Sequence, residues 1–375
     1  MDKKKTTKNA VSAANRSNIY HYMYSHASLS RQDIAYALRL SLPTVTQDIN
    51  ELIGEGLIET AGKNDETGGR HAITYSIVPD ARLAIGLEIN KHHIAAAVVD
   101  LQGNIRYKIR IRRLFERSDT YYRYLGSMVD TAVKSAGIDA SRILGVGIGV
   151  PGLVTPDNNR ITYGKILDLN DVGLEEFSRY IPFPTLLFND ANAAGLAEMW
   201  ANGKIANAFY IMLSSNIGGS IIINHQVYDG EDFRSGEIGH LQIVPGGKTC
   251  YCGQYGCMDA YCASSVLSDT AGGKLEEFFR LLKCGDEKAE KVWSEYLDHL
   301  AFAINMIRML FDCQIILGGY VGAYIDTYLP DLKKRVMQYN PFDKTGDFLV
   351  PCIRKEEAIA SGTALSFISD FLKTI

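Results

Sequence analysis

The sequence of 375 residues lacks any apolar run near the roughly 18 residues that a helix needs to cross a bilayer. Its opening stretch, MDKKKTTKNAVSAANR, also lacks the apolar core of a signal peptide, so we expect a cytoplasmic protein with no membrane partner. A strong charge of one sign is missing as well. The formal net charge of −4 excludes a general attraction to polyanions, so any contact with nucleic acid must be local.

Cysteine is scarce except in one stretch, TCYCGQYGCMDAYC at residues 249–262, which holds four of the seven cysteines. Cys250, Cys252 and Cys257 form a C-x-C-x4-C cluster there. A reducing cytoplasm favours a metal site over a disulfide framework. His240 lies ten residues before Cys250 and supplies a fourth donor. Zn²⁺ favours such a tetrahedral Cys3His set, so we predict a structural zinc site, with a redox switch as the alternative.

The pattern of the first eighty residues predicts short helices followed by a hairpin. A helix is expected over 15–26, a second over 31–40 capped by Ser30, and a third that starts near Pro43 and ends at Gly54. LIETAG and HAITYSIV then alternate as strands around the polar tip KNDETGGR. This order is typical of a winged helix-turn-helix, whose second motif helix enters the major groove.

On this interpretation the helix reaches DNA through exposed polar residues near its start, namely Thr44, Thr46, Gln47 and Asn50. Gln and Asn pair bidentately with adenine, and Thr contacts a base edge or a thymine methyl group. Arg70, at the wing, would enter the minor groove or hold a phosphate. A flexible phosphate-binding arm is expected from Lys3, Lys4, Lys5 and Lys8. The alternative is a small helical domain that binds protein.

From residue 83 onward, strands and helices alternate. LAIGLEIN, HIAAAVVD and NIRYKIRI predict three neighbouring strands, followed by a helix over 119–136 and the buried strand ILGVGIGV. AFYIMLS, GGSIIIN and QVYDG repeat this meander about 120 residues later, ahead of another buried strand, CQIILGG. The repeat predicts two α/β lobes with a ligand in the cleft between them. Two unrelated α/β domains in series are the alternative.

A strand that ends at Asn189 and Asp190 runs directly into a helix. Polar groups at the carboxyl end of such a strand project into the ligand crevice of an open α/β sheet. Asp190 is therefore a candidate ligand-binding residue. The alternative is that it only caps the helix.

Together these residues resemble the ROK family (repressors, open reading frames, kinases), whose body is an actin-like, two-lobed sugar-kinase fold. The motifs that carry the resemblance are E-x-G-H at residues 237–240 and C-x-C-G-x-x-G-C at residues 250–257. It covers nearly the whole chain, including the winged helix of the family's repressors. The expected parts are a winged helix-turn-helix over 1–78, a first lobe over 79–190, and a second lobe with the zinc-binding loop over 191–375.

The resemblance also implies a sugar site. The family's sugar contacts match residues Gly152, Asn189, Asp190, Glu237, His240 and Asp259. Asp190 corresponds to the catalytic base of the family's kinases, His240 is also a zinc ligand, and Asp259 stands where the family usually has Glu.

Both phosphate loops of the family's kinases are altered. D-x-G-G-T-K is replaced by GLEINKHHI, which has lost both loop glycines, and G-T-G-I-G-G is replaced by SSNIGGS. Side chains then occupy the space that close backbone approach to a phosphate requires. Only Gly318 and Gly319, near the family's adenosine site, are kept.

We therefore expect no enzyme activity. The expected protein is a sugar-responsive transcriptional regulator, most directly a repressor, that acts as a homodimer or homotetramer. Its partners would be operator DNA and a monosaccharide or sugar derivative. The alternatives are an ATP-dependent sugar kinase with an accessory DNA-binding domain, and a zinc-stabilised carbohydrate-binding scaffold that does not bind DNA.

Overall fold

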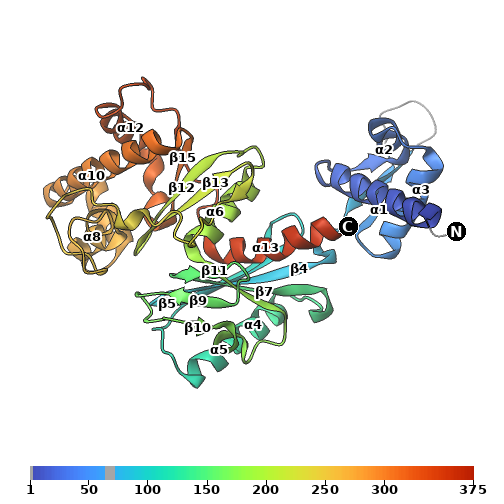
Figure 1. The fold of residues 1–375 in the computed structure, drawn as a ribbon, viewed down its shortest axis with the longest axis horizontal. Helices are drawn as coiled ribbons and strands as arrows, with labels where there is room; N and C mark the ends of the chain where they lie inside the picture. Colours follow the sequence, from blue (N-terminus) through green and yellow to red (C-terminus); the bar gives the residue numbers. More distant parts are fainter. Residues whose placement is uncertain (1–2, 64–71) are drawn as a thin grey trace.

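The computed structural model describes residues 3–63 and 72–375, with side chains for residues 13–62 and 72–375. Arg70, the predicted wing residue, lies outside the described residues. A small N-terminal domain stands apart from a larger two-lobed body (Figure 1). Within the described part of the chain, no helix is long and apolar enough to span a membrane.

The N-terminal domain is a winged helix, and we call residues 3–63 and 72–78 the winged-helix domain. Its helices are α1 (Lys3–Tyr24), α2 (Arg31–Leu38) and α3 (Leu42–Gly54). Its strands β1 (Leu29–Ser30), β2 (Ile58–Lys63) and β3 (Ile73–Ile77) form an antiparallel sheet in the order β1-β3-β2. The predicted helix-turn-helix and hairpin are confirmed.

Local side chains explain where these helices start. Ser30 and Asp33 form a capping box at α2: the Asp33 N–H donates to Ser30 Oγ at 3.2 Å, and the Ser30 N–H donates to Asp33 Oδ2 at 3.0 Å. Ser41 caps α3 by accepting the Thr44 N–H at 3.3 Å, and Pro43 lies in the first turn.

Two expectations for this domain are wrong. The first helix begins at Lys3 and not at residue 15, because no glycine or proline interrupts residues 3–24. The expected flexible lysine arm is therefore part of α1.

The body contains two five-stranded sheets with the same strand order. The first lobe holds β11-β7-β4-β5-β6, and the second holds β14-β13-β12-β15-β16. In each, three antiparallel strands are extended by two parallel ones. The strands of the first sheet are β4 (Leu83–Ile89), β5 (His93–Asp100), β6 (Ile105–Arg112), β7 (Ile143–Val150) and β11 (Thr185–Asn189). Those of the second are β12 (Ala208–Leu213), β13 (Ile217–Ile223), β14 (Gln226–Val227), β15 (Gln314–Gly318) and β16 (Leu349–Pro351). The predicted repeat of the meander is confirmed.

Helices cover both sheets. The helices of the first lobe are α4 (Asp119–Ser135) and α5 (Leu174–Ser178), beside a small sheet of β8 (Leu153–Val154), β9 (Arg160–Tyr163) and β10 (Val172–Gly173). Those of the second lobe are α7 (Asp259–Cys262), α8 (Ser264–Ser268), α9 (Leu275–Lys283), α10 (Glu287–Phe311), α11 (Gly319–Gly322) and α12 (Leu329–Met337). In Figure 1, α4 and α5 lie on the face of the first sheet opposite α13.

Two further helices, α6 (Asp190–Ala201) and α13 (Ala358–Thr374), lie side by side between the lobes (Figure 1). The chain thus returns at its C-terminus to the first sheet, where α13 packs on β4 and β7. Glycine makes this contact possible: a Cβ at Gly86 would overlap the backbone of Ala360. The Thr363 hydroxyl, on the same helix, donates to the Gly147 carbonyl at 3.1 Å.

Candidate functional site

A polar pocket lies where the two lobes meet. It takes one wall from the loop after β7, another from the junction of β11 and α6, and a third from the turn before β13 and the loop of residues 237–251. Five of the six predicted sugar-binding residues line it, namely Gly152, Asn189, Asp190, Glu237 and His240. The remaining lining residues include Tyr163, Lys165, Asn216 and Tyr251.

Asn189 and Asp190 divide their tasks at the start of α6. Asn189 is the helix cap, because its Oδ1 accepts the Asn192 N–H at 2.9 Å. Its Nδ2 donates to the Gly152 carbonyl at 3.1 Å and so ties the β7 loop to the helix. Asp190 is the first helical residue, and its Oδ1 accepts only the N–H of Ala191, at 2.9 Å. The alternative, in which Asp190 is the helix cap, does not hold, because the cap is Asn189.

The acidic groups in the pocket hold their protons unusually tightly. Burial, followed by the negative charges of Glu237 and Glu88, raises the pKa of Asp190 to about 7. Burial also raises the pKa of Glu237, and it lowers the pKa of His240. These groups therefore offer both hydrogen-bond donors and acceptors near neutral pH, as recognition of hydroxyl groups requires.

Asp259, the sixth predicted residue, does not line the pocket. It is buried on α7, where its Oδ1 accepts the backbone N–H of Ile217 at 2.6 Å. Burial raises the pKa of Asp259 to about 6. Since Ile217 itself lines the pocket, Asp259 holds the turn before β13 in place.

Tyr251 is a pocket residue that the sequence analysis missed. Its hydroxyl lies 3.3 Å from His240 Nε2, and the two rings meet edge to face at 5.4 Å. The signal that could have identified Tyr251 is its position as an aromatic residue between two cysteines of the predicted metal-binding loop.

The predicted metal ligands come together beside this pocket. The donor atoms of His240, Cys250, Cys252 and Cys257 all lie within 4.8 Å of one another. His240 Nδ1 is 3.9 Å from Cys250 Sγ, and the sulfurs of Cys252 and Cys257 are 3.8 Å apart. Tetrahedral zinc–thiolate bonds of about 2.3 Å would separate sulfurs by roughly 3.8 Å, so the cluster fits a metal ion.

The protonation of the thiols would depend on a bound cation. Burial raises the pKa of Cys250 to about 12, and neighbouring thiolates add to the effect. A divalent cation would offset both, because it stabilises the deprotonated ligands. Gly253 and Gly256 turn the loop with φ of +95° and +79°, a region that disfavours other residues.

In place of the first phosphate loop there is a closed turn between β4 and β5. Asn90 Oδ1 accepts the backbone N–H groups of His92 and His93 at 2.8 and 2.9 Å. Glu88, which is almost fully buried, accepts from Tyr320 at 3.0 Å and from Arg110 at 3.2 Å, and lies 2.9 Å from His93 Nε2. Burial opposes ionisation of Glu88, but the His93 hydrogen bond and the Arg110 charge together lower its pKa. In this turn two backbone amides and a buried carboxylate are therefore hydrogen-bonded within the protein.

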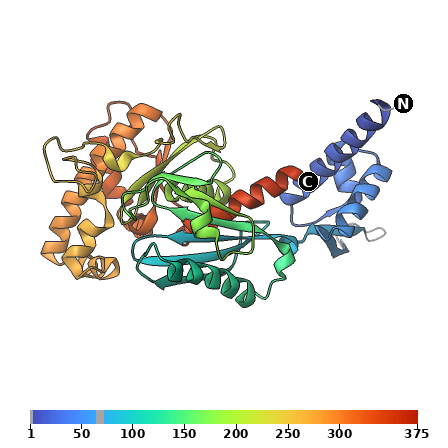
Figure 2. The same cartoon turned by 60° about the horizontal axis from the view of Figure 1, so that its bottom comes forward.

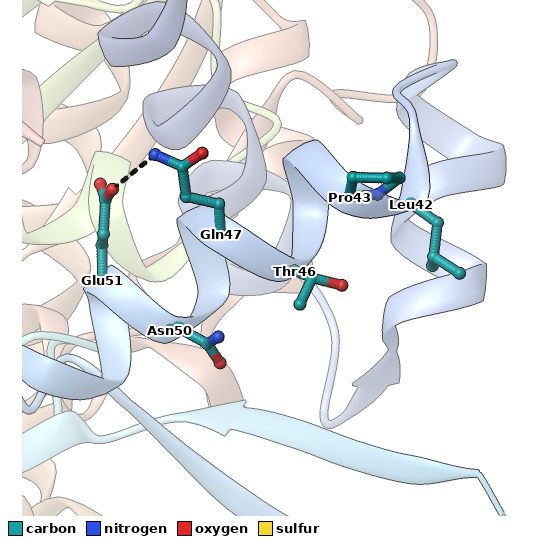
Figure 3. Close-up of a pocket in the computed structure, with 6 residues that line it drawn as sticks. All are labelled: Leu42, Pro43, Thr46, Gln47, Asn50 and Glu51. Atoms are coloured by element: carbon teal, nitrogen blue, oxygen red, sulfur yellow. Dashed lines mark hydrogen bonds between the residues drawn. The ribbon is translucent and has the colours of Figure 1, made fainter.

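The exposed surface of α3 forms a shallow recess, shown in Figure 3, between Leu42, Pro43, Thr46, Gln47, Asn50 and Glu51. Gln47 Nε2 donates to Glu51 Oε1 at 3.0 Å, and Asn50 Oδ1 accepts from Arg31 at 3.1 Å. Thr44 is half-buried, with its hydroxyl 2.8 Å from that of Ser41. Leu42 is 45% exposed and was not among the predicted DNA-binding residues. Its signal in the sequence was its position directly before the proline that starts the helix.

Comparison with known proteins decides the family. Residues 84–365, three quarters of the chain, match the family described as the ROK family. The chain belongs to the ROK family. A xylose repressor from Caldicellulosiruptor bescii is 27% identical over 369 residues, with 92% of each chain covered. The DNA-binding transcriptional dual regulator NagC from Escherichia coli is 25% identical and covers 86% of this chain and 84% of its own.

Solved structures of ROK proteins share the fold. A ROK family transcriptional regulator, described as a homolog of the Escherichia coli MLC protein, superposes with a TM-score of 0.74 at 21% identity and covers 97% of both chains. A ROK family glucokinase from Streptomyces griseus, in complex with glucose and AMPPNP, has a TM-score of 0.64 at 23% identity. It covers 76% of this ROK chain and 98% of its own. The difference in coverage indicates that the kinase matches the body alone.

The raised pKa of Asp190 predicts a pH-dependent cost in stability. The pKa of folded Asp190 is about 7, whereas in the unfolded chain the group ionises near its ordinary pKa of 3.8, so the folded state loses stability as the pH rises between these values. The melting temperature of Asp190→Asn should therefore rise relative to wild type from pH 4 to pH 7. Asp157→Asn is the control, because hydrogen bonds from Thr155 and Asn159 lower the pKa of Asp157, so its contribution changes only below about pH 4 and its melting temperature should stay parallel to that of wild type in this window. Parallel melting curves for Asp190→Asn and wild type would contradict the assignment.

Proposed function

We propose that this protein is a sugar-responsive transcriptional regulator, a repressor in its simplest form, that binds operator DNA through α3 and a sugar between its lobes. One observation carries the proposal: a single chain holds both a winged helix with a polar, exposed α3 and an interlobe pocket lined by Asp190, Glu237 and His240. Relatives that align over about nine tenths of the chain are named xylose repressor. Others are named N-acetylglucosamine repressor. These names support the same proposal.

In the sugar pocket, the carboxyl groups and the imidazole would make different hydrogen bonds to the sugar. Asp190 and Glu237 would form hydrogen bonds with sugar hydroxyl groups, and a bond to the ionised carboxylate, the form that Asp190 takes above about pH 7, contributes about 1.5–3 kcal/mol. With Nδ1 of His240 directed at the thiols, its Nε2 would carry the ring proton and donate toward the pocket. Asn189 has one amide hydrogen beyond its bond to Gly152, and Asp259 would support the site through Ile217.

On the DNA side, Gln47 and Asn50 are the base-reading candidates because both are exposed and carry amides. Gln47 would exchange its bond to Glu51 for one to a base. Thr46 and Thr44 would make the shorter contacts near the start of the helix. Arg70 would add a wing contact to the minor groove or to a phosphate.

We also propose that the body is not a working kinase, although it shares its fold with sugar kinases. Phosphoryl transfer depends almost wholly on positioning the phosphates and stabilising their charge. Asn90 already occupies the amides of His92 and His93, and Glu88 is held by Arg110 and Tyr320. This supports a sensor in which the cleft binds a sugar without a nucleotide.

The remaining parts of the proposal concern metal, assembly and domain limits. We infer a structural zinc ion held by His240, Cys250, Cys252 and Cys257, which would supply rigidity and no reaction step. Helix-turn-helix proteins read paired half-sites as dimers, so we infer a homodimer or homotetramer. We place the protein in the cytoplasm and keep the division at 1–78, 79–190 and 191–375, with α13 returning to the first lobe.

The DNA assignment makes a direct prediction. Gln47→Ala should weaken binding to an operator selected from random-sequence duplexes by about 1–3 kcal/mol, the value of a good bidentate pair. Fluorescence anisotropy with labelled duplex measures it. Gln226→Ala, an exposed glutamine on β14, should leave operator affinity unchanged. If Gln47→Ala binds as tightly as wild type, α3 does not read bases through this position.

The sugar assignment predicts separable effects for Asp190→Asn. The variant should bind its sugar about 1–3 kcal/mol more weakly, the loss of a charged hydrogen bond, while operator affinity without sugar stays near wild type. Calorimetry against D-xylose, D-glucose and N-acetylglucosamine measures the first, and anisotropy the second. Asp168→Asn, an exposed aspartate outside the pocket, is the matched control. Wild-type protein should consume no ATP above background with any of these sugars, and clear consumption would reinstate the kinase.

The thiol cluster predicts about one zinc per chain in protein purified without chelator. Cys252→Ser should lose the metal and lower the melting temperature, because the loop of residues 246–257 loses its cross-link. Cys284→Ser, at an exposed cysteine far from the cluster in sequence, should change neither. Elemental analysis that finds no metal in wild-type protein would refute the site.

A further inference from the structure

Two helices connect the interlobe cleft with the winged-helix domain. α6 begins at the pocket residue Asp190, and in its last turn Trp200 contacts Tyr24 of the winged-helix domain. α13 begins after Glu357, which pairs with Arg110 at 3.2 Å in the cleft, and its far end lies beside the winged-helix domain in both views (Figures 1 and 2). With 12 residues, α6 covers about 18 Å at 1.5 Å per residue.

The helix pair is packed too closely for one member to slide past the other. A Cβ at Gly362 of α13 would overlap the backbone of Ala193 on α6. Glu198 of α6 is 1% exposed and accepts the N–H groups of Ile353 and Arg354, at 2.8 and 3.0 Å, just before α13. Close-packed interiors transmit displacements instead of absorbing them. A shift at the start of α6 therefore moves its far end.

The far end of α6 meets the turn between β5 and β6. Trp200 Nε1 donates to the Gln102 carbonyl at 3.3 Å, and Arg354 Nη2 donates to the Gly103 carbonyl at 3.0 Å. The same turn contacts the winged helix, because the Tyr24 hydroxyl donates to the Leu101 carbonyl. The ring of Tyr24 meets that of Trp200 edge to face, with centroids 6.5 Å apart.

Tyr24 is in turn connected to the DNA-reading helix. It is the last residue of α1, whose Ile19, Tyr20 and Met23 share one buried core with Val45 and Ile49 of α3. A tilt of α1 at Tyr24 therefore reorients α3.

We propose that Trp200 and Tyr24 are positioning residues: a sugar at the start of α6 sets the orientation of the winged-helix domain through their contact. The proposal rests on the proposed function, because it needs both a sugar and an operator. A sugar shifts DNA binding only if it binds two lobe arrangements unequally. In the proposal, the two lobe arrangements differ at the contact between Trp200 and Tyr24, and this difference changes the orientation of α3.

The chain contains only two tryptophans, Trp200 and Trp293, which makes the contact observable. The sugar for this test is the one that raises the melting temperature, chosen among D-xylose, D-glucose, N-acetylglucosamine and N-acetylglucosamine 6-phosphate. In Trp293→Phe, Trp200 is the sole tryptophan, and its fluorescence emission should change when that sugar is added. The change should saturate at the concentration at which that sugar saturates binding in calorimetry. Trp200→Phe reports instead on Trp293, buried in the second-lobe core, and should respond less. Sugar binding that leaves Trp200 emission unchanged would overturn the proposal.

A second measurement tests the effect on DNA. Tyr24→Phe removes one hydrogen bond from the junction and keeps the ring, whereas Trp200→Phe removes one hydrogen bond and replaces the indole with a smaller phenyl ring. In each, the ratio of operator affinities with and without sugar should move at least about fivefold toward one, the lower end of typical allosteric coupling. Calorimetric sugar affinity and sugar-free operator affinity should stay within about twofold of wild type. Tyr36→Phe, on a 90% exposed residue of α2, is the control and should keep the wild-type ratio.

The outcomes separate the two proposals. Wild-type coupling in both junction variants would overturn the role of Trp200 and Tyr24 and leave the proposed function standing. A wild-type protein that binds no sugar of the panel, or no selected duplex, would overturn both.

Discussion

The contact between α13 and the first sheet is the constraint on which the rest of the molecule depends. Gly86 leaves no side chain against Ala360, and Thr363 donates to Gly147, so helix and sheet approach more closely than larger residues would allow. α13 also holds α6 against it through Gly362. Because α6 begins at the pocket, this packing fixes where Asp190 stands relative to Glu237 and His240. The positions of the pocket residues therefore depend on the packing of these two helices as well as on the loops that line the pocket.

The cleft holds two regions that differ in how their polar groups are partnered. In the turn after β4, Asn90 accepts two backbone N–H groups, and Glu88 is enclosed by cationic and phenolic groups. The pocket beside this turn is lined by the carboxyl groups of Asp190 and Glu237, and Asp190 accepts the N–H of Ala191. The polar groups of the turn are therefore bound within the protein, whereas those of the pocket line the space between the lobes.

Sequence reasoning succeeded where the cause of structure is local. The caps Ser30 and Ser41, the alternating strands and the spacing of Cys250, Cys252 and Cys257 all act over a few residues, and the structure contains them. It failed where tertiary context decides. The sequence predicts a first helix from residue 15, because the lysines before it are typical of a flexible arm, but lysine does not break a helix and α1 begins at Lys3. The position of Tyr251 and the return of α13 depend on contacts across the fold, which no local pattern encodes.

The return of α13 also has a consequence for biosynthesis. About 270 residues separate Gly86 from Ala360, so at translation rates of about 5–20 residues per second the strand that holds Gly86 is made roughly 14–55 seconds before the helix that covers it. During that interval an apolar sheet face has no partner in its own chain, and contacts of such long sequence separation also form slowly. The nascent protein is thus exposed to aggregation in its first lobe, and chaperones have most to protect there.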